Sequence, residues 1–448
     1  MKRIRLARFR YYLTGIIVLI ILCSTGACKS NNKTKTETIS ICTEERMKLI
    51  VEDVMKYFND TRETPVDFQV TYIPENENER AGVCKRLRTE LMTGKGADIY
   101  ILAEYQRNGG LFSVDEDTLL LPDANKTLNS GVFKDISEYT TDDESFQKCF
   151  APVMEAGAVD GRQYIVPFSF DTRLLKSIKE LNAGSITLED CRKPLTQLLK
   201  EEKLQEMNPY DFLDVGTWIG NSFDYQKGEI YFSEEDVIHV LEYATADGGY
   251  YDPDFIPEYW AAPGQYESLH SFDSYLEELQ ETEYGYLPMV TLDGRPAARI
   301  LSYGAVGRTC KNPELAYDFL RIFWQDEFVS RDGLSVPHED FTAYYHNATV
   351  LNLGGIPVRE DLWEKWYLIK SGTSEPTETA VKNAQNFSNA LGQTVTARFL
   401  CTVDNLGTEI NNMFMKDGYV DLDRDGVEED IELAADMLYN NIRYIVME

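Results

Sequence analysis

The sequence has few of the residues on which common catalytic sites depend. It contains four histidines (His239, His270, His338 and His346), and none belongs to an H-E-x-x-H zinc motif. It also has no G-x-S-x-G nucleophile motif. Glycosidases need only a pair of carboxylates, and 75 acidic residues always offer some pair, so a secreted lipoprotein glycoside hydrolase stays open as an alternative. The missing motifs make catalysis the less favoured class.

Close cysteine pairs and long apolar runs are missing as well. Six cysteines follow the N-terminal segment without the C-x-x-C spacing of a zinc site, and they leave disulfides and buried free thiols equally open: Cys42, Cys84, Cys149, Cys191, Cys310 and Cys401. The longest N-terminal apolar run, "IIVLIILC" (16–23), is too short for a permanent membrane span. This segment instead fits a signal peptide.

Basic residues are scarce outside the first ten positions. The chain has 44 Lys and Arg against 75 Asp and Glu, a net charge of −31. Such a surface repels nucleic acid and anionic lipid, so neither is expected as a partner through charge. The Gly-Lys-Gly turn at 94–96 follows a predicted helix and precedes a predicted strand, the reverse of a phosphate-binding loop. We therefore interpret it as a joint between a helix and a strand.

The N-terminus predicts export and attachment to a membrane. A basic start and an apolar segment are followed by "STGAC" (24–28), which resembles a bacterial lipobox with Cys28 as the lipidated residue. Thr25 departs from that pattern, where Leu is usual, and leaves plain secretion as the alternative. We assign residues 1–27 to a lipoprotein signal peptide and 28–37 to a flexible polar tether.

The next segment alternates between strand and helix patterns. Strands are predicted at 38–42, 66–73 and 98–102, with helices at 44–59 and 77–92. This β-α-β-α-β order predicts a parallel sheet whose strands gather ligands at their carboxyl ends. Thr43, Glu44, Ala103 and Glu104 occupy those ends.

Four stretches in order resemble the extracellular solute-binding proteins of family 1 type, which serve ABC transporters. They are "TELMTGKGADIYIL" (89–102), "GVFKDISEYTTDD" (131–143), "GAVDGRQYIVPFSF" (157–170) and "YGAVGRTCKNPELAYDFLRIFWQDEF" (303–328). "GLSVPHEDF" (333–341) is similar to the turn that follows in that family. Cys310 and Tyr317 stand where Ser and Trp are common. The resemblance covers about residues 38–345, and beyond 350 it rests on helical content alone.

The resemblance implies an α/β, two-lobed periplasmic-binding-protein-like (type II) clamshell with a ligand cleft between the lobes. Lobe one is expected at 38–145 plus 295–345, and lobe two at 146–294 plus 346–448. The implied function is delivery of a small solute, an oligosaccharide above all, to an ABC permease, without catalysis. A peptide or a polyamine is the alternative ligand. The expected form is a monomer, lipid-anchored at the extracellular face of the bacterial cell membrane.

Candidate ligand residues are polar or aromatic side chains near strand ends and loops. Stacking aromatics and hydroxyl-binding polar groups would suit a saccharide. Trp218 and Trp260 could instead be core residues, and a core position is the favoured interpretation of Tyr303. Trp324 is predicted to pack in the core from an amphipathic helix. The full candidate set is Glu44, Glu104, Phe168, Asp171, Trp218, Asn221, Trp260 and Tyr303.

One acidic loop matches a calcium-binding pattern. "DLDRDGVEEDIE" (421–432) fits D-x-D-x-D-G-x5-E, with Asp421, Asp423, Asp425 and Glu432 as carboxylate ligands and the carbonyl of Val427 as a further ligand. Glu428 departs from the pattern, where an apolar residue is usual. The alternative is an Asp-Gly turn into a helix with an acidic first turn. A structural calcium ion is therefore an expectation, and no other cofactor is predicted.

Overall fold

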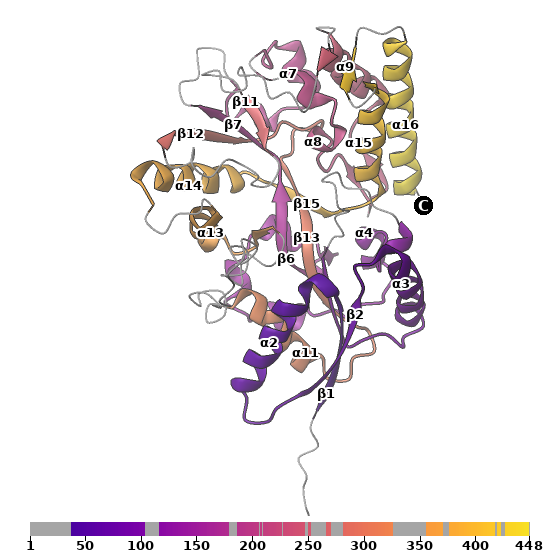
Figure 1. Cartoon of the computed structure of the whole chain (residues 1–448), viewed down its shortest axis with the longest axis vertical. Helices are drawn as coiled ribbons and strands as arrows, with labels where there is room; N and C mark the ends of the chain where they lie inside the picture. Colours follow the sequence, from indigo (N-terminus) through magenta and orange to yellow (C-terminus); the bar gives the residue numbers. More distant parts are fainter. Residues whose placement is uncertain are drawn as a thin grey trace, which may run out of the picture.

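The computed structural model places most of the chain in two bodies, stacked along the long axis in Figure 1. It describes residues 37–103, 116–178, 186–205, 207, 209–225, 227–246, 250–251, 266–269, 281–325, 355–370, 376–416, 419–422 and 426–447. We name the two bodies the lower lobe and the upper lobe, after their places in that view. The signal peptide, Cys28, Glu104, Trp260, Asp423 and Asp425 lie outside the described residues.

The lower lobe starts with the predicted β-α-β-α-β unit. Strand β1 (Thr38–Glu44) pairs in parallel with β2 (Asp67–Ile73) and with β3 (Ile99–Ala103). The helices between them are α2 (Lys48–Asp60), after a 3-10 turn, and α3 (Glu77–Met92). Buried aliphatic residues on one face of α2 cover the sheet. The predicted order and type of these elements are confirmed.

The Gly-Lys-Gly turn is a joint between α3 and β3, as predicted. Gly94 has φ of +72° just after the helix C-cap, a conformation that favours glycine. A Cβ at Gly96 would lie 1.9 Å from the Tyr100 hydroxyl oxygen. Close packing between the turn and β3 therefore explains the second glycine, and no phosphate role is needed.

Two long strands continue this sheet toward the upper lobe. Strand β6 (Ile165–Thr172) pairs antiparallel with β13 (Ala297–Val306), and β13 pairs antiparallel with β3. The order is β14-β6-β13-β3-β1-β2, with β15 (Thr396–Phe399) paired to the upper end of β13. All eight residues of β6 are buried, as expected for a central strand with both faces covered.

Short helices and turns complete the lower lobe. Helix α11 (Pro313–Leu320) lies within the 303–328 stretch, and it begins with the Asn312 cap and Pro313. Trp324 is fully buried in the following 3-10 turn, so its predicted packing role is confirmed. The remaining elements are η1 (Glu45–Met47), η2 (Glu116–Thr118), α4 (Ala124–Leu128), α5 (Ser137–Thr140), η3 (Phe146–Lys148), α6 (Ala151–Glu155), β4 (Ala158–Val159), β5 (Arg162–Gln163), α11 (Pro313–Leu320), η7 (Arg321–Trp324), β14 (Ile356–Pro357), η10 (Glu360–Leu362), α13 (Trp363–Lys370) and α14 (Glu378–Leu391).

The upper lobe has a mainly helical core beside small sheets. Helix α16 (Val427–Met447) packs on α9 and α15 through Ile431, Leu438 and Ile442, and Figure 1 shows these helices side by side. Its buried face docks on the upper core, with Ile442 buried and Asn441 exposed. The other elements are β7 (Leu174–Ile178), η4 (Asp190–Arg192), α7 (Leu195–Lys200), η5 (Pro209–Phe212), α8 (Val215–Trp218), β8 (Phe223–Asp224), β9 (Glu229–Ile230), α9 (Glu234–Thr245), β10 (Tyr250–Tyr251), β11 (Tyr266–Leu269), β12 (Tyr284–Pro288), α15 (Thr402–Met413), β16 (Met415–Lys416) and β17 (Tyr419–Asp421).

Two separate hydrophobic cores divide the chain differently from the predicted lobe boundaries. Residues 150–174 and 356–399 were expected in lobe two, but their buried side chains belong to the lower core. The reason is strand pairing, because β6, β14 and β15 all extend the sheet that β1 to β3 begin. The upper core is built from buried residues between 175 and 244, between 289 and 292, and between 401 and 446.

The described chain passes between the lobes at three places. These are the joint from β6 to β7, the segment from β12 to β13, and the segment from β15 to α15. At the first, Leu174 belongs to the lower core and Leu175 to the upper core. Such short crossing segments are where a change in lobe orientation would be absorbed.

All six cysteines beyond the N-terminal segment are free and buried, which settles the open choice between thiols and disulfides. Burial raises the pKa of each, to about 11 for Cys84 and Cys310. They therefore act as small apolar core residues. Among the described residues, no helix combines the length and apolar character needed to cross a membrane.

Candidate functional site

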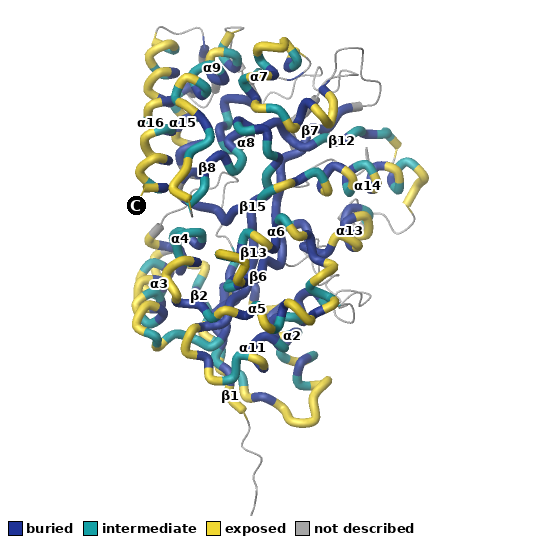
Figure 2. Tube along the Cα trace, turned by 180° about the vertical axis from the view of Figure 1, so that it is seen from behind, coloured by how far each residue is buried: buried dark blue, intermediate teal, exposed yellow. Residues whose placement is uncertain are grey.

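A cavity of about 240 Å³ lies where the two lobes meet beside β15. In Figure 2, α4 and α6 of the lower lobe lie below this region and β8 of the upper lobe lies above it. The lining comes from both lobes and from β15 between them, and polar atoms dominate it. The lining residues are Asn125, Leu128, Pro152, Glu155, Ala156, Ala158, Asn221, Phe223, Asp224, Tyr225, Arg295, Val395, Thr396, Ala397 and Arg398.

The lower wall is fixed by hydrogen bonds between α4 and β15. Asp123 caps α4 by accepting from the backbone N–H of Lys126. The Asn125 side chain donates to the carbonyl of Phe399 at 3.3 Å and accepts from the Phe399 N–H at 3.2 Å. The Asn125 side-chain amide thus bonds both backbone groups of Phe399, as a neighbouring strand would. It therefore holds the start of α4 against the floor of the cavity.

The upper wall is joined to the floor through Asn221, which is the one predicted ligand residue within the described ranges that lines the cavity. Its Nδ2 donates to Thr396 Oγ1 at 2.7 Å, across the border between the lobes. Arg295 donates to the Asn221 carbonyl at 2.8 Å. Gly220, just before it, has φ of +59°, which turns the chain after α8 toward β15.

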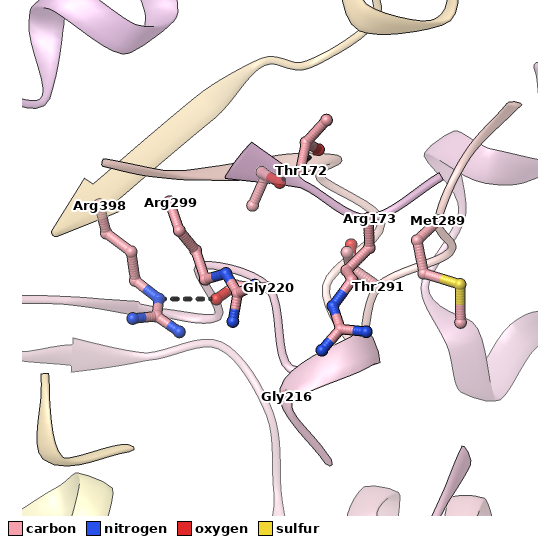
Figure 3. Close-up of a pocket in the computed structure, with 9 residues that line it drawn as sticks. Thr172, Arg173, Gly216, Gly220, Met289, Thr291, Arg299 and Arg398 are labelled. Carbon is pink, nitrogen blue, oxygen red and sulfur yellow. Dashed lines mark hydrogen bonds between the residues drawn. The ribbon is translucent and has the colours of Figure 1, made fainter. Parts of the chain in front are cut away.

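A second, much smaller cavity of about 20 Å³ lies deeper in the border, next to the crossing segments. A water molecule needs about 10–15 Å³, so this space fits a single water and is too small for a sugar ring. Figure 3 shows three arginines around it: Arg173, Arg299 and Arg398. The Arg398 Nε donates to the carbonyl of Gly220 at 3.1 Å.

Each of these arginines has a carboxylate partner. Arg398 donates to both oxygens of Asp404 at 2.6 and 2.7 Å, and Arg299 donates to Asp171 at 2.6 Å. Arg173 pairs with Asp214 at 3.1 Å. Burial opposes ionisation of Asp404, but the charge and hydrogen bonds of Arg398 outweigh it and lower the pKa of Asp404. Arginine charge is therefore neutralised in place by carboxylates.

This arginine-carboxylate network ties the crossing strands to the upper lobe. Arg299 and Arg398 extend from β13 and β15, whereas Asp404 lies in the first turn of α15. Arg299 also lies 3.9 Å from Asp404, so two strands share one carboxylate. Asp171, which is 1% exposed, keeps its Oδ1 without a hydrogen bond from any residue that the structure describes.

Three of the predicted ligand residues are core residues instead. Phe168 is buried and stacks on Phe323 with ring centroids 4.3 Å apart. Trp218 has no exposed surface, and its Nε1 donates to the Phe212 carbonyl inside the upper lobe. Tyr303 is buried edge-on against Phe399. Their rings stabilise the cores, so the core interpretation of Trp218 and Tyr303 is confirmed and the assignment of Phe168 to the cleft is wrong.

The predicted carboxylates also differ from expectation. Glu44 is buried and accepts from Arg80 with both oxygens, at 2.7 and 2.9 Å, so its side chain serves a structural ion pair at the end of β1. Asp171 does not line the larger cavity. Its side chain binds Arg299, which lines the smaller cavity of about 20 Å³. Glu104 and Trp260 fall outside the described residues.

Several lining residues were missed in the sequence. Asn125, Glu155, Asp224, Arg295 and Thr396 come from five separate parts of the chain. A usable signal was the "PDANK" helix start at 122–126, since a capped helix after a predicted sheet places its polar N-terminus near the strand ends. No local pattern marks the others, because only the fold brings them together.

Comparison with solved structures assigns the fold. The chain is similar to an extracellular solute-binding protein family 1 from Alicyclobacillus acidocaldarius subsp. acidocaldarius DSM 446, with 12% identity, 92% and 99% of the two chains covered, and a TM-score of 0.51. The sugar-binding protein MalE from Xanthomonas citri gives 12% identity, 92% and 97% coverage, and a TM-score of 0.51. The cyclic alpha-maltosyl-1,6-maltose binding protein from Arthrobacter globiformis gives 13% identity, 91% and 99% coverage of the two chains, and a TM-score of 0.50.

These neighbours share the whole architecture at low sequence identity. The chain therefore has the two-lobed fold of extracellular solute-binding proteins, as the resemblance implied. No family model matches the sequence, and no curated protein matches it. At this level of identity the likeness concerns the fold.

Proposed function

We propose that this protein is an extracellular solute-binding protein that captures a saccharide and presents it to an ABC importer. The observation that carries the proposal is the cavity between the lobes, whose polar lining comes from both of them. Its side chains include carboxylates, amides and two arginines, which are groups that hydrogen-bond sugar hydroxyls. Tyr225 adds aromatic surface for the C–H faces of a sugar ring.

The mechanism is closure of the lobes over the ligand. Binding groups on Asn125 and Glu155 belong to the lower lobe, and those on Asn221 and Asp224 belong to the upper lobe. A ligand that contacts both sets stabilises the closed state more than the open one and so shifts the population toward closure. The three crossing segments would absorb the motion, and the closed form would be the one that a permease accepts.

Membrane attachment is part of the same proposal. Strand β1 begins at the end of the lower lobe that points away from the upper lobe (Figure 1). A lipid on Cys28 with a ten-residue tether would hold this end at the extracellular face of the membrane and leave the cavity free. The diacylglyceryl group has two chains, and two chains give stable anchoring. Replacing Cys28→Ser should move the protein from membranes to the soluble fraction; unchanged retention would contradict the anchor.

The test of the proposed function is a thermal-shift screen of the purified soluble protein. A ligand that binds the native state alone must raise the melting temperature. We expect a saccharide from the panel to raise it, with peptides and polyamines as the competing ligand classes. Shifts with polyamines or peptides alone would redirect the proposal within the same class of binding protein.

The same screen separates binding from catalysis. The proposal is capture without turnover, so the bound saccharide should be recovered intact after incubation. Product in excess of the protein concentration would instead support a glycoside hydrolase that uses a pair of carboxylates. Chromatography of the incubated saccharide gives this answer directly.

A further inference from the structure

An outer groove of about 550 Å³ borders the cavity on the upper lobe. It lies between the start of α7, the segment before α9, and the chain between β12 and β13. Its lining residues are Pro194, Thr196, Tyr231, Asp236, Leu292, Asp293 and Arg295. None of them was a candidate in the sequence.

The groove and the cavity share a wall. Arg295 lines both spaces, and its guanidinium lies 4.6 Å from the ring centroid of Tyr231. Arg295 is held by Asp293, with Nε 2.6 Å from Oδ2. The Tyr231 hydroxyl lies 3.5 Å from Oδ2 of Asp224, a cavity residue. One stacked pair of side chains therefore has the cavity on one side and the groove on the other.

The lining of the groove combines the two kinds of surface that a sugar contacts. Pro194, Leu292 and the ring of Tyr231 are apolar, and sugar C–H faces pack on such surfaces. Thr196 offers a hydroxyl. Asp236 uses Oδ2 to cap α9, and its Oδ1 takes no hydrogen bond from the residues that the structure describes, so it is available to a ligand hydroxyl.

The size of the cavity points in the same direction. At about 240 Å³ it is smaller than the roughly 300–1,000 Å³ typical of sites for small ligands. A ligand with further sugar units would have to extend beyond it, and the outer groove, on the other side of Arg295, has matching chemistry. A single sugar or a disaccharide would leave that groove unused.

We propose that the outer groove is an extension of the ligand site, and that the ligand is an oligosaccharide whose later units lie along Tyr231 and Thr196. This inference rests on the proposed function, because it assumes that the cavity binds a saccharide. Arg295 is then the residue that contacts the chain on both sides of the wall. Its two fixed hydrogen-bond partners keep it in place for that role.

Calorimetric titration against a length series tests the extension. The probes are α-1,4-linked glucose oligosaccharides and β-1,4-linked mannose oligosaccharides, each from two to six units. Thr196→Trp fills the groove, and Gln197→Trp places the same side chain on the next, exposed residue of α7 as the matched control. We expect the affinity of the native protein to rise at least tenfold with length, and Thr196→Trp to abolish that rise while the disaccharide affinity stays.

The outcomes separate the two proposals. Equal affinity for all lengths in the native protein, or an unchanged length dependence in Thr196→Trp, would overturn the extension and leave the proposed function standing. Loss of the length dependence in Gln197→Trp as well would also overturn it, since the effect would not be specific to the groove. If no saccharide of either series or of the thermal-shift panel binds the native protein, the proposed function fails and the extension fails with it.

Discussion

In the lower lobe, Arg80 is fully buried and donates to both oxygens of Glu44, whereas at the border between the lobes Arg398 is buried and donates to both oxygens of Asp404. Arg80 also binds the carbonyls of Pro74 and Thr118, all within one lobe. Arg398 instead extends from the central sheet into the first turn of an upper-lobe helix.

The difference shows that a buried arginine-carboxylate pair can serve two structural purposes. Inside a lobe, a buried ion pair fixes elements that always move together. At the border, the same pair connects bodies whose relative orientation has to change if the lobes close over a ligand. Buried pairs contribute little net stability but are costly to break on one side, so both sites resist local disorder.

Removing one partner of either pair should give the largest effect. Arg80→Met and Arg398→Met each leave a buried carboxylate without its partner, which costs about 3–5 kcal/mol. Urea unfolding measures the loss. Hydrogen exchange should then show lost protection in the lower lobe for Arg80→Met, and at the start of α15 and in β15 for Arg398→Met. Identical hydrogen-exchange patterns in the two variants would contradict the claim that the Arg80 pair acts within one lobe and the Arg398 pair acts at the border between the lobes.

Calcium should act on the upper lobe alone. The predicted loop at 421–432 runs into α16, which packs on the upper core. Excess calcium at a hundred times Kd would stabilise the lobe by about 2.7 kcal/mol. The measurement is the melting temperature with calcium against chelator, in the native chain and in Asp421→Ala/Asp423→Ala. Equal melting temperatures in the native chain would mean that the loop is only an acidic helix start.

Acid should also weaken the upper lobe. Burial opposes ionisation of Asp190, but hydrogen bonds from Thr187 and Lys193 outweigh it and lower its pKa to about 2. Because the folded pKa lies below the ordinary value of 3.8, this stability is present above pH of about 4 and is lost as the pH falls toward 2. The loss is about 2 kcal/mol at 1.36 kcal/mol per pKa unit. The unfolding free energy, measured with urea at several pH values in this range, should fall more steeply with decreasing pH in the native chain than in Asp190→Asn. Equal slopes against pH would contradict the assignment.

The smallest effect is expected for the contact across the cavity. Asn221→Ala removes a polar side chain from the cavity wall and should lower saccharide affinity about fivefold, since one hydrogen bond to a ligand contributes about 1 kcal/mol. The melting temperature should change little. Asn389→Ala, on an exposed position of α14, is the matched control and should leave affinity unchanged. An affinity loss in both variants would place the effect outside the cavity.

Much of the lower lobe could be predicted from the sequence, because its elements follow from local patterns. The helix-strand joint at Gly94, the strands β1 to β3 and the helix after Asn312 all have such signals. The lobe boundaries could not be predicted, since β14 and β15 join the sheet from a distant part of the chain. Pairing partners at that separation leave no local mark.

The candidate site was harder to predict, because aromatic side chains serve cores as well as ligands. Trp218 sits in a loop-rich segment that suggested exposure, yet its ring fills the upper core. Asn221, three residues later, does line the cavity. Its position follows from the turn at Gly220, where φ is +59°, rather than from its residue type.

The central claim is that the cavity between the lobes holds the saccharide, and a blocked cavity tests it most directly. Ala156→Trp places a large ring in the cavity from the end of α6, and Gln197→Trp is the control outside it. The measurement is calorimetric titration with the saccharide that raises the native melting temperature. The account predicts one site per native chain, lost in Ala156→Trp and kept in Gln197→Trp, with both variants folded. Equal binding by the native protein and a folded Ala156→Trp would contradict it.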